Sequence, residues 1–325
     1  MKEEISSNFR KIKLFIKRII HFFTVKIWLV SAEVGLSAFK KVWYKVSRIL
    51  SITVKQFQKN QCTVSASDLT YYSLFAVVPF FAIAYGVAML FGLEYFLNSQ
   101  IYSALGGQEN LGERLMTFSQ RIISEAKVGV ISVVALVFFF WSIITMLSSI
   151  EKTMNNIWNV RKRRRFVSRM LGFLLFVLIV PSLLVIGSAA NIFISANIIR
   201  FFPELLQESL QFLTSFLIPV GIFCVLFFII YQSVPYQKIN PRSSFWAAIF
   251  AGAAFQALQY YYFNVQIAIS SYNTIYGSLA ALPLLLVWIK LSWTIVLFGA
   301  ELAYGIEHER NFTSSRQFRQ ASRNL

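Results

Sequence analysis

Charged residues are scarce in this chain, and acidic residues are the scarcest of them. Of 325 residues, 14% are charged, with 31 Lys and Arg against 14 Asp and Glu, whereas 57% are hydrophobic and 33 are Phe. A soluble protein carries about 25% charged residues. The composition therefore excludes an ordinary soluble domain and predicts an integral membrane protein.

Residues suited to metal binding or redox chemistry are nearly absent. The chain has two histidines, His21 and His308, and two cysteines, Cys62 in a basic segment and Cys224 in an apolar run. They form no cluster with metal-ligand spacing, and cysteines at different membrane depths do not pair. A phosphate-binding glycine loop and a nucleophile-elbow motif are missing as well. We therefore expect no metal, no cofactor and no enzymatic activity.

The net charge of +17 is concentrated in the N-terminal segment, one short loop and the C-terminal tail. Residues 1–67 hold thirteen Lys and Arg against three Glu. Such placement is typical of the cytoplasmic segments of membrane proteins rather than of a nucleic-acid surface. We therefore expect membrane lipids as partners, anionic lipids among them, and no nucleic acid. The oligomeric state is left open.

The basic segment 1–67 also carries an amphipathic pattern. Apolar residues recur at steps of three, four and seven, at Leu36, Phe39, Trp43, Val46, Leu50 and Phe57. Lys41, Lys45 and Arg48 occupy another face. This pattern predicts a helix that lies in the head-group region, and residues 8–29 resemble it less cleanly. A helix packed on the protein's own cytoplasmic side fits the pattern equally well.

The rest of the chain predicts an all-α, polytopic domain at 68–305, followed by a basic, poorly ordered tail at 306–325. The six candidate spans are 69–92, 128–150, 171–194, 210–231, 245–268 and 278–304. Loops 151–170 and 232–244 are basic, whereas loops 93–127, 195–209 and 269–277 are not. Basic loops remain in the cytoplasm, so both termini are expected there.

Four prolines fall within these spans, at Pro79, Pro181, Pro219 and Pro283. Proline bends a helix, so several spans are expected to be kinked. Two three-helix halves of opposite orientation would give this distribution, and chance would give it equally well.

Three blocks resemble the YihY/BrkB family of bacterial inner-membrane proteins, some of which have been called virulence factors and, formerly, ribonuclease BN. The blocks are ASDLTYYSLFAVVPFF (66–81), NNIWNVRKRRRFVSRML (155–171) and YGSLAALPLLLVWIKLSWTIVLFGAEL (276–302). The resemblance implies a six-helix protein of a bacterial cytoplasmic membrane, and export of lipids or other amphiphiles. A ribonuclease needs acidic or histidine metal ligands, and the sequence offers no such set.

Lys290 lies near the middle of the last apolar span. A charge there costs at least about 2.5–3 kcal/mol on insertion scales. Glu301 would lie about 16 Å along the helix and cannot pair with it. Lys290 therefore either packs and extends its stem toward the interface, or lines a wet cavity that receives an anionic group. The family usually has an uncharged residue here, often Tyr.

Three further groups of residues are candidates for function. The fifth span carries a polar stripe, which with Lys290 forms a hypothetical substrate site: Gln256, Gln259, Tyr260 and Asn264. Three carboxylates fall at cytoplasmic ends of spans: Asp68, Glu151 and Glu301. The basic loop holds their possible counter-ions: Arg161, Lys162, Arg163, Arg164 and Arg165. The carboxylates either anchor these arginines or the N-terminal helix, or relay protons or cations.

The sequence as a whole favours a protein that binds or translocates a lipid-like or amphiphilic anion through a cavity between helices. The alternative is a membrane scaffold or assembly partner without transport. A transporter predicts a polar cavity that reaches Lys290 or the polar stripe, and a scaffold predicts dry helix contacts there.

Overall fold

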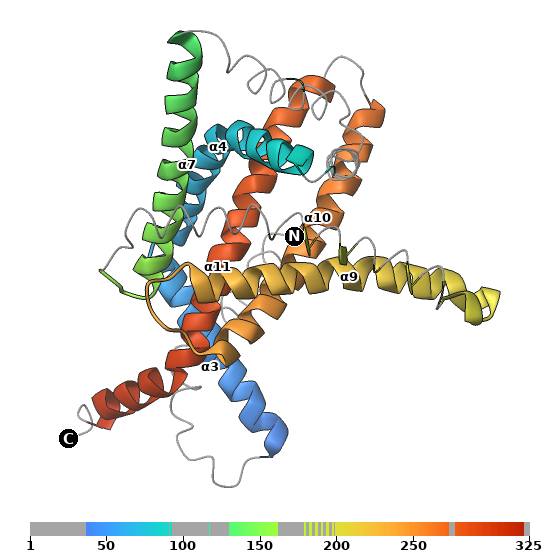
Figure 1. Ribbon diagram of the computed structural model, residues 1–325. Coiled ribbons are helices and arrows are strands. Elements are labelled where there is room, and N and C mark those ends of the chain that lie inside the picture. Colours follow the sequence, from blue (N-terminus) through green and yellow to red (C-terminus); the bar gives the residue numbers. More distant parts are fainter. Residues whose placement is uncertain are drawn as a thin grey trace, which may run out of the picture. The chain divides into compact units, whose positions relative to one another are not determined.

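The computed structural model describes residues 37–90, 130–161, 199–272 and 277–321, with isolated positions between residues 92 and 197. The elements are α3 (Ala38–Lys59), α4 (Cys62–Leu90), α7 (Val130–Ile157), the 3₁₀ turn η2 (Ile199–Phe201), α9 (Glu204–Ser233), α10 (Pro241–Tyr272) and α11 (Gly277–Ala321) (Figure 1). No strand occurs in these described ranges, which confirms the all-α class for that part of the chain.

Five of the predicted spans coincide with α4, α7, α9, α10 and α11, and the span at 171–194 lies outside the continuously described ranges. Within the described residues, two helical segments are long and apolar enough to cross a membrane, Leu206–Ser233 and Pro283–Thr313. Pro219 and Pro283 lie inside α9 and α11. Six crossings and proline kinks stay predictions.

The chain forms two compact units. The first contains α3 and the part of α11 from Glu301 onward, and the second contains residues Gln61–Ala300. The helix α11 contributes residues to both units, because it is continuous from Gly277 to Ala321.

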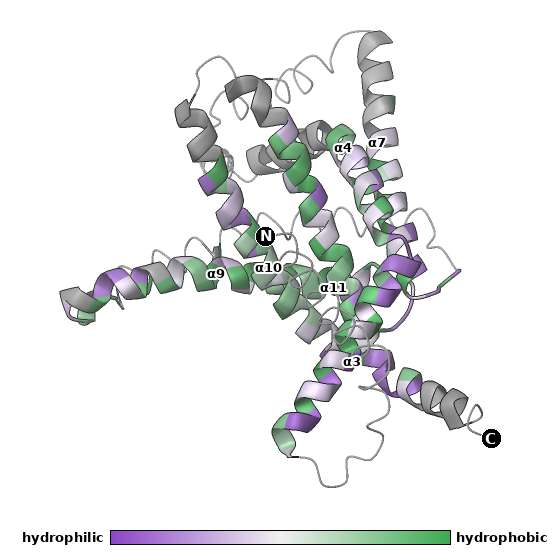
Figure 2. Cartoon of the chain, turned by 180° about the vertical axis from the view of Figure 1, so that it is seen from behind, coloured by the Kyte–Doolittle hydropathy of each residue, from purple (hydrophilic) through white to green (hydrophobic). Residues whose placement is uncertain are grey.

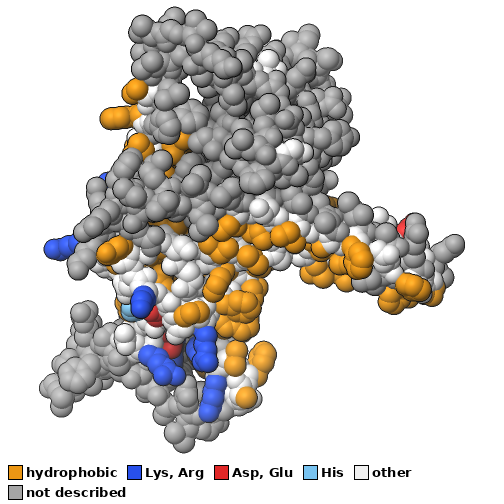
Figure 3. Space-filling view, in the orientation of Figure 1, with side chains coloured by type: hydrophobic (Ala, Val, Ile, Leu, Met, Phe, Trp, Pro, Cys, Tyr) orange, Lys and Arg blue, Asp and Glu red, His pale blue; other side chains and the backbone are white. Residues whose placement is uncertain are grey.

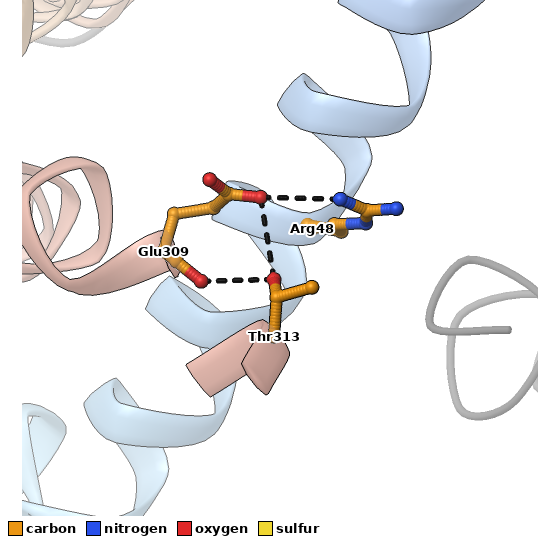
Figure 4. A network of polar contacts seen from close by, with 3 residues as sticks. All are labelled: Arg48, Glu309 and Thr313. Carbon is orange, nitrogen blue, oxygen red and sulfur yellow. Dashed lines mark hydrogen bonds and ion pairs between the residues drawn. The ribbon is translucent and has the colours of Figure 1, made fainter. Parts of the chain in front are cut away.

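An ion pair joins α3 to α11 in the first unit. The guanidinium of Arg48 donates from Nη1 to Oε1 of Glu309 at 3.4 Å, and both residues are buried (Figure 4). The hydroxyl of Thr313 donates to the backbone oxygen of Glu309 at 2.9 Å and approaches its carboxylate at 3.4 Å. Since a buried charge needs a partner, these contacts fix which face of α3 meets α11.

Close packing and a second polar contact extend this junction. A β-carbon added at Gly305 would lie 2.9 Å from Oγ1 of Thr53, so α3 and α11 approach closely there. The amide of Asn60 donates to Oε1 of Glu301 at 2.7 Å. Residues 306–321 were expected to form a poorly ordered tail, but they continue α11. The polar composition of this segment suggested a tail, but one of its polar residues, Glu309, pairs with Arg48 of α3.

Helices of the second unit contact one another at small side chains and through hydrogen bonds. Gly252 of α10 lies against Cys224 of α9. The hydroxyl of Tyr231 in α9 donates to the backbone oxygen of Val296 in α11 at 3.0 Å. The indole of Trp293 in α11 donates to Oγ of Ser73 in α4 at 2.8 Å.

Many large apolar side chains of the second unit remain exposed. Examples are Trp141 on α7, Leu206, Leu213 and Leu217 on α9, Phe245 and Trp246 on α10, and Val287 and Leu291 on α11. Hydrophobic residues recur along α9 and α11 (Figure 2), and orange side chains recur along the described part of α9 that is visible in Figure 3. Exposed apolar surface of this extent indicates contact with lipid.

Candidate functional site

A polar cavity of about 460 Å³ lies between α4 and α7, which pack against each other (Figure 1). Its lining comprises Ser65, Asp68, Leu69 and Tyr72 from α4, Ser149, Lys152, Thr153, Asn155 and Asn156 from α7, and Val160 and Arg161 beyond α7. Ligand pockets have volumes of about 300–1,000 Å³, so this cavity is large enough to hold a small polar group.

Helical periodicity explains why these residues share the cavity. Residues three and four apart lie on one face of a helix. Ser65, Asp68 and Tyr72 follow this spacing on α4, and Lys152 and Asn156 follow it on α7. The cavity is therefore formed by two polar faces, one from each helix.

The end of α7 positions the last cavity residues. Asn159 adopts a left-handed backbone with φ of 54°. The Val160 amide donates to the Asn155 carbonyl at 2.8 Å, and the Asn159 amide donates to the Asn156 carbonyl at 3.1 Å. These two bonds form a Schellman motif, in which asparagine is tolerated at the left-handed position. The helix thus ends sharply, and Arg161 follows directly.

A side-chain contact anchors this helix end. Asn155 is 4% exposed, and its Oδ1 accepts a hydrogen bond of 2.8 Å from the backbone amide of Tyr236. The contact ties the segment after α9 to the last turn of α7. The α7 wall of the cavity is therefore held by structure outside the cavity.

Charges of both signs face this cavity. Asp68 lies on α4, whereas Lys152 and Arg161 come from α7 and the residues after it. All three are exposed, and no ion pair or hydrogen bond joins them to one another or to another described residue. The cavity therefore offers an acceptor for a cation and two donors for an anion.

The predicted carboxylates are found in different settings. Asp68 lines the cavity, Glu151 is buried on α7, and Glu301 is 0% exposed and bonded to Asn60. Glu301 belongs to the first unit and the other two to the second, so their clustering stays a prediction. Within the described residues, no group of three His, Cys, Asp or Glu could hold a metal ion.

Of the five basic-loop residues predicted as counter-ions, only Arg161 lies within the described residues. Arg161 lines the cavity. The remaining members lie outside the described residues: Lys162, Arg163, Arg164 and Arg165.

Lys290 and the polar stripe do not line the α4–α7 cavity. Lys290 is exposed on α11, and its backbone oxygen accepts a hydrogen bond from the Thr294 hydroxyl at 2.7 Å. On α10, Tyr260 and Asn264 are exposed, and the Asn264 amide donates to the Tyr260 carbonyl at 2.8 Å.

The other two residues of the stripe are half-buried. The Oε1 atoms of Gln256 and Gln259 are buried without a hydrogen-bond partner in the described part of the chain, as is the indole nitrogen of Trp288 on α11. Unsatisfied buried polar atoms cost free energy, so these side chains differ from ordinary core residues.

The cavity itself was not predicted from the sequence. Lys152 falls in the basic loop 151–170 and Tyr72 in the predicted span 69–92, and the sequence analysis did not connect the two residues. The signal that could have found them is the matching polar periodicity of 65–72 and 149–156. It was missed because periodicity identifies a polar face but not the helix that it contacts.

Comparisons with known proteins point to one family. The chain matches the family described as Virulence factor BrkB over residues 53–324. A UPF0761 membrane protein of Chromohalobacter salexigens is 32% identical over 274 residues, which cover 82% of this chain and 64% of that protein. A Pseudomonas aeruginosa protein of the same name is 30% identical, with 82% and 63% covered. One from Pseudoalteromonas atlantica is 30% identical, with 83% and 91% covered. No solved structure matches the chain.

Proposed function

Because the chain belongs to the Virulence factor BrkB family of membrane proteins, we propose that it binds and translocates a lipid-like, anionic amphiphile whose head group enters the α4–α7 cavity. The family match confirms the resemblance found in the three sequence blocks. The chain spans about two thirds of the first two relatives named above, and the relatives' names state no substrate. The choice of substrate therefore rests on the chemistry of the cavity.

The proposed architecture is a bacterial cytoplasmic-membrane domain of six crossing helices, 68–305, with both termini in the cytoplasm. The alternation of basic and non-basic loops supports this orientation. Arg161 of the basic loop lines the α4–α7 cavity. In this orientation the cavity therefore lies near the cytoplasmic surface. The same surface attracts anionic lipid, so the basic loop would raise the local concentration of the substrate.

The observation that carries the proposal is the pair of cations in the cavity, Lys152 and Arg161, for which the described residues supply no ion-pair partner. Arg161 offers a planar fork that suits two phosphate oxygens, and Lys152 offers a compact point charge. Asn156 adds an amide donor from the same helical face. A phosphate group of an amphiphile could use all three, while its acyl chains stay in the surrounding lipid.

Lys290 and the stripe on α10 fit the proposal as a later position on the translocation path. Support comes from the unsatisfied oxygens of Gln256 and Gln259 and from the mid-span position of the lysine. The competing role for Lys290 is packing with an extended stem.

The alternative function is a membrane scaffold without transport. The observation that favours it is the first unit, in which α3 turns a row of exposed apolar side chains outward, from Phe39 to Val54. A scaffold would use this surface to hold a partner or the membrane. It would leave the α4–α7 cavity filled with water alone.

Native mass spectrometry of the detergent-purified protein separates these functions. The double variant Lys152→Ala/Arg161→Ala is expected to lose bound phospholipid by at least about tenfold, because hydrogen bonds to charged groups contribute about 1.5–3 kcal/mol each. Lys238→Ala is the matched control, since Lys238 is exposed and does not line the cavity. Equal lipid occupancy in all three proteins would refute the cavity as a head-group site. Lys290→Ala, measured in parallel, tests whether Lys290 contributes to lipid binding at a later position on the translocation path.

A further inference from the structure

The carboxylate of Asp68 limits which head groups suit the cavity. Asp68 shares the cavity with Lys152 and Arg161, but no ion pair joins it to either of them in the described structure. An anionic group held by the two cations would also experience repulsion from Asp68. A head group that carries only negative charge therefore leaves one wall of the cavity poorly matched.

The α4 wall instead suits an ammonium group. Tyr72 lies one helical turn from Asp68 and lines the same cavity. A carboxylate accepts hydrogen bonds from an ammonium, and an aromatic ring attracts a cation over its face. Hydroxyls of Ser65 and Ser149 add neutral acceptors around the same space. The helix α4 thus contributes a negative group and an aromatic ring to the cavity lining, whereas α7 and the residues after it contribute positive groups.

We propose that the cavity recognises a zwitterionic head group, with its phosphate on Lys152 and Arg161 and its primary amine on Asp68, as phosphoethanolamine lipids provide. This inference rests on the proposed function and specifies its substrate class. Charges of opposite sign on two walls orient such a head group, because reversing it would place like charges together. The volume of about 460 Å³ leaves space for the head group and for bridging water.

The test compares two lipids on the intact protein. Wild type in detergent is titrated with phosphatidylethanolamine or phosphatidylglycerol of identical acyl chains, and bound lipid is counted by native mass spectrometry. Wild type is expected to prefer phosphatidylethanolamine by at least about fivefold. Asp68→Asn is expected to abolish that preference, because the neutral amide no longer attracts the amine. A wild-type preference for phosphatidylglycerol, or an unchanged preference in Asp68→Asn, would overturn the inference.

Control variants distinguish a failure of the zwitterionic head-group inference from a failure of the proposed function. Glu208→Gln removes an exposed carboxylate that does not line the cavity, and it is expected to keep the wild-type preference. Lys152→Ala/Arg161→Ala is expected to weaken both lipids alike. If this double variant loses both lipids while Asp68→Asn behaves as wild type, the head-group site stands and the amine contact is refuted. If neither changes binding, both proposals fail.

The type of amine is tested with phosphatidylcholine, whose quaternary ammonium has no N–H group to donate. Weaker binding of phosphatidylcholine than of phosphatidylethanolamine is expected, and equal binding would refute the hydrogen bond to Asp68. Asp68 is exposed, so Asp68→Asn should fold. Asp68→Ser provides a second variant that must give the same loss of preference.

Discussion

Gly252 determines how closely α9 and α10 approach each other. A β-carbon at this position would lie 2.7 Å from the sulfur of Cys224 and 2.9 Å from its backbone nitrogen. A side chain can rotate away from such a contact, but a backbone atom moves only with its helix. The absence of a side chain at Gly252 is therefore a requirement of this helix pair.

Replacing Gly252 with alanine is expected to destabilise the protein by about 1–3 kcal/mol, the usual cost of overpacking. The measurement is the midpoint of thermal unfolding in detergent, followed by tryptophan fluorescence. Gly221→Ala in α9 is the matched control, because a β-carbon there meets nothing within 4 Å. The control should leave the midpoint unchanged or raise it, since alanine favours helix. Equal midpoints for the two variants would contradict the close approach.

Single residues also show which contacts could not be predicted from the sequence. Asp68 was singled out as a carboxylate at the end of a predicted span, and the structure shows that it lines a cavity. Its cavity partner Lys152 lies on a helix far along the chain, and no local pattern links the two. Arg48 was assigned to a polar face, yet its partner Glu309 lay in a segment taken for a tail. Such pairs depend on tertiary packing, which one sequence does not specify.

At the scale of elements, α3 has two faces with different surroundings. One face meets α11 through Arg48, and the other exposes large apolar side chains, with Phe39 78% and Trp43 58% exposed. Lys41 and Lys45 are also exposed, and helical spacing places them on another side of α3 from this apolar row. An exposed apolar row beside lysines is typical of a helix that lies in an anionic membrane surface.

We expect the apolar row of α3 to insert among lipid chains. A bimane label is placed at Trp43→Cys, Val46→Cys or Lys41→Cys in a background of Cys62→Ala and Cys224→Ala. In nanodiscs with brominated acyl chains, bimane at positions 43 and 46 should be quenched strongly, and bimane at position 41 weakly. Absent quenching at all three positions would favour the alternative, a helix packed on the protein's own surface.

Element positions were predicted better than element ends. Long apolar runs located α4, α7, α9, α10 and α11, because a helix that crosses lipid needs an apolar surface on all sides. The ends differ because polar residues continue the helices: α4 begins at Cys62 and α7 ends at Ile157. The stop after α7 depends on the left-handed backbone of Asn159, and asparagine alone is a weak signal for it.

At the scale of the whole molecule, the distribution of charge predicts the orientation in the membrane. The basic loops 151–170 and 232–244 and both basic terminal segments are expected on one side of the membrane. The described structure supplies helices for five of the six predicted crossings, and the count of six rests on the apolar runs of the sequence.

Reporter fusions should verify this orientation. Alkaline phosphatase fused after residue 202 is expected to be active, and fusions after residues 160 and 238 are expected to be inactive, because the enzyme requires the periplasm. Green fluorescent protein at the C-terminus should fluoresce, as it does in the cytoplasm. Phosphatase activity after residue 160 or 238 would disprove the six-helix orientation.

The exposure of the three charged cavity residues has one more consequence. Since Asp68, Lys152 and Arg161 all contact water, dissolved ions can surround each of them. Electrostatic attraction in such a site decreases beyond about 8 Å at physiological ionic strength and reaches farther in dilute buffer. The lipid affinities expected of the proposed head-group site should therefore vary with salt, and values for different lipids are comparable only at one salt concentration.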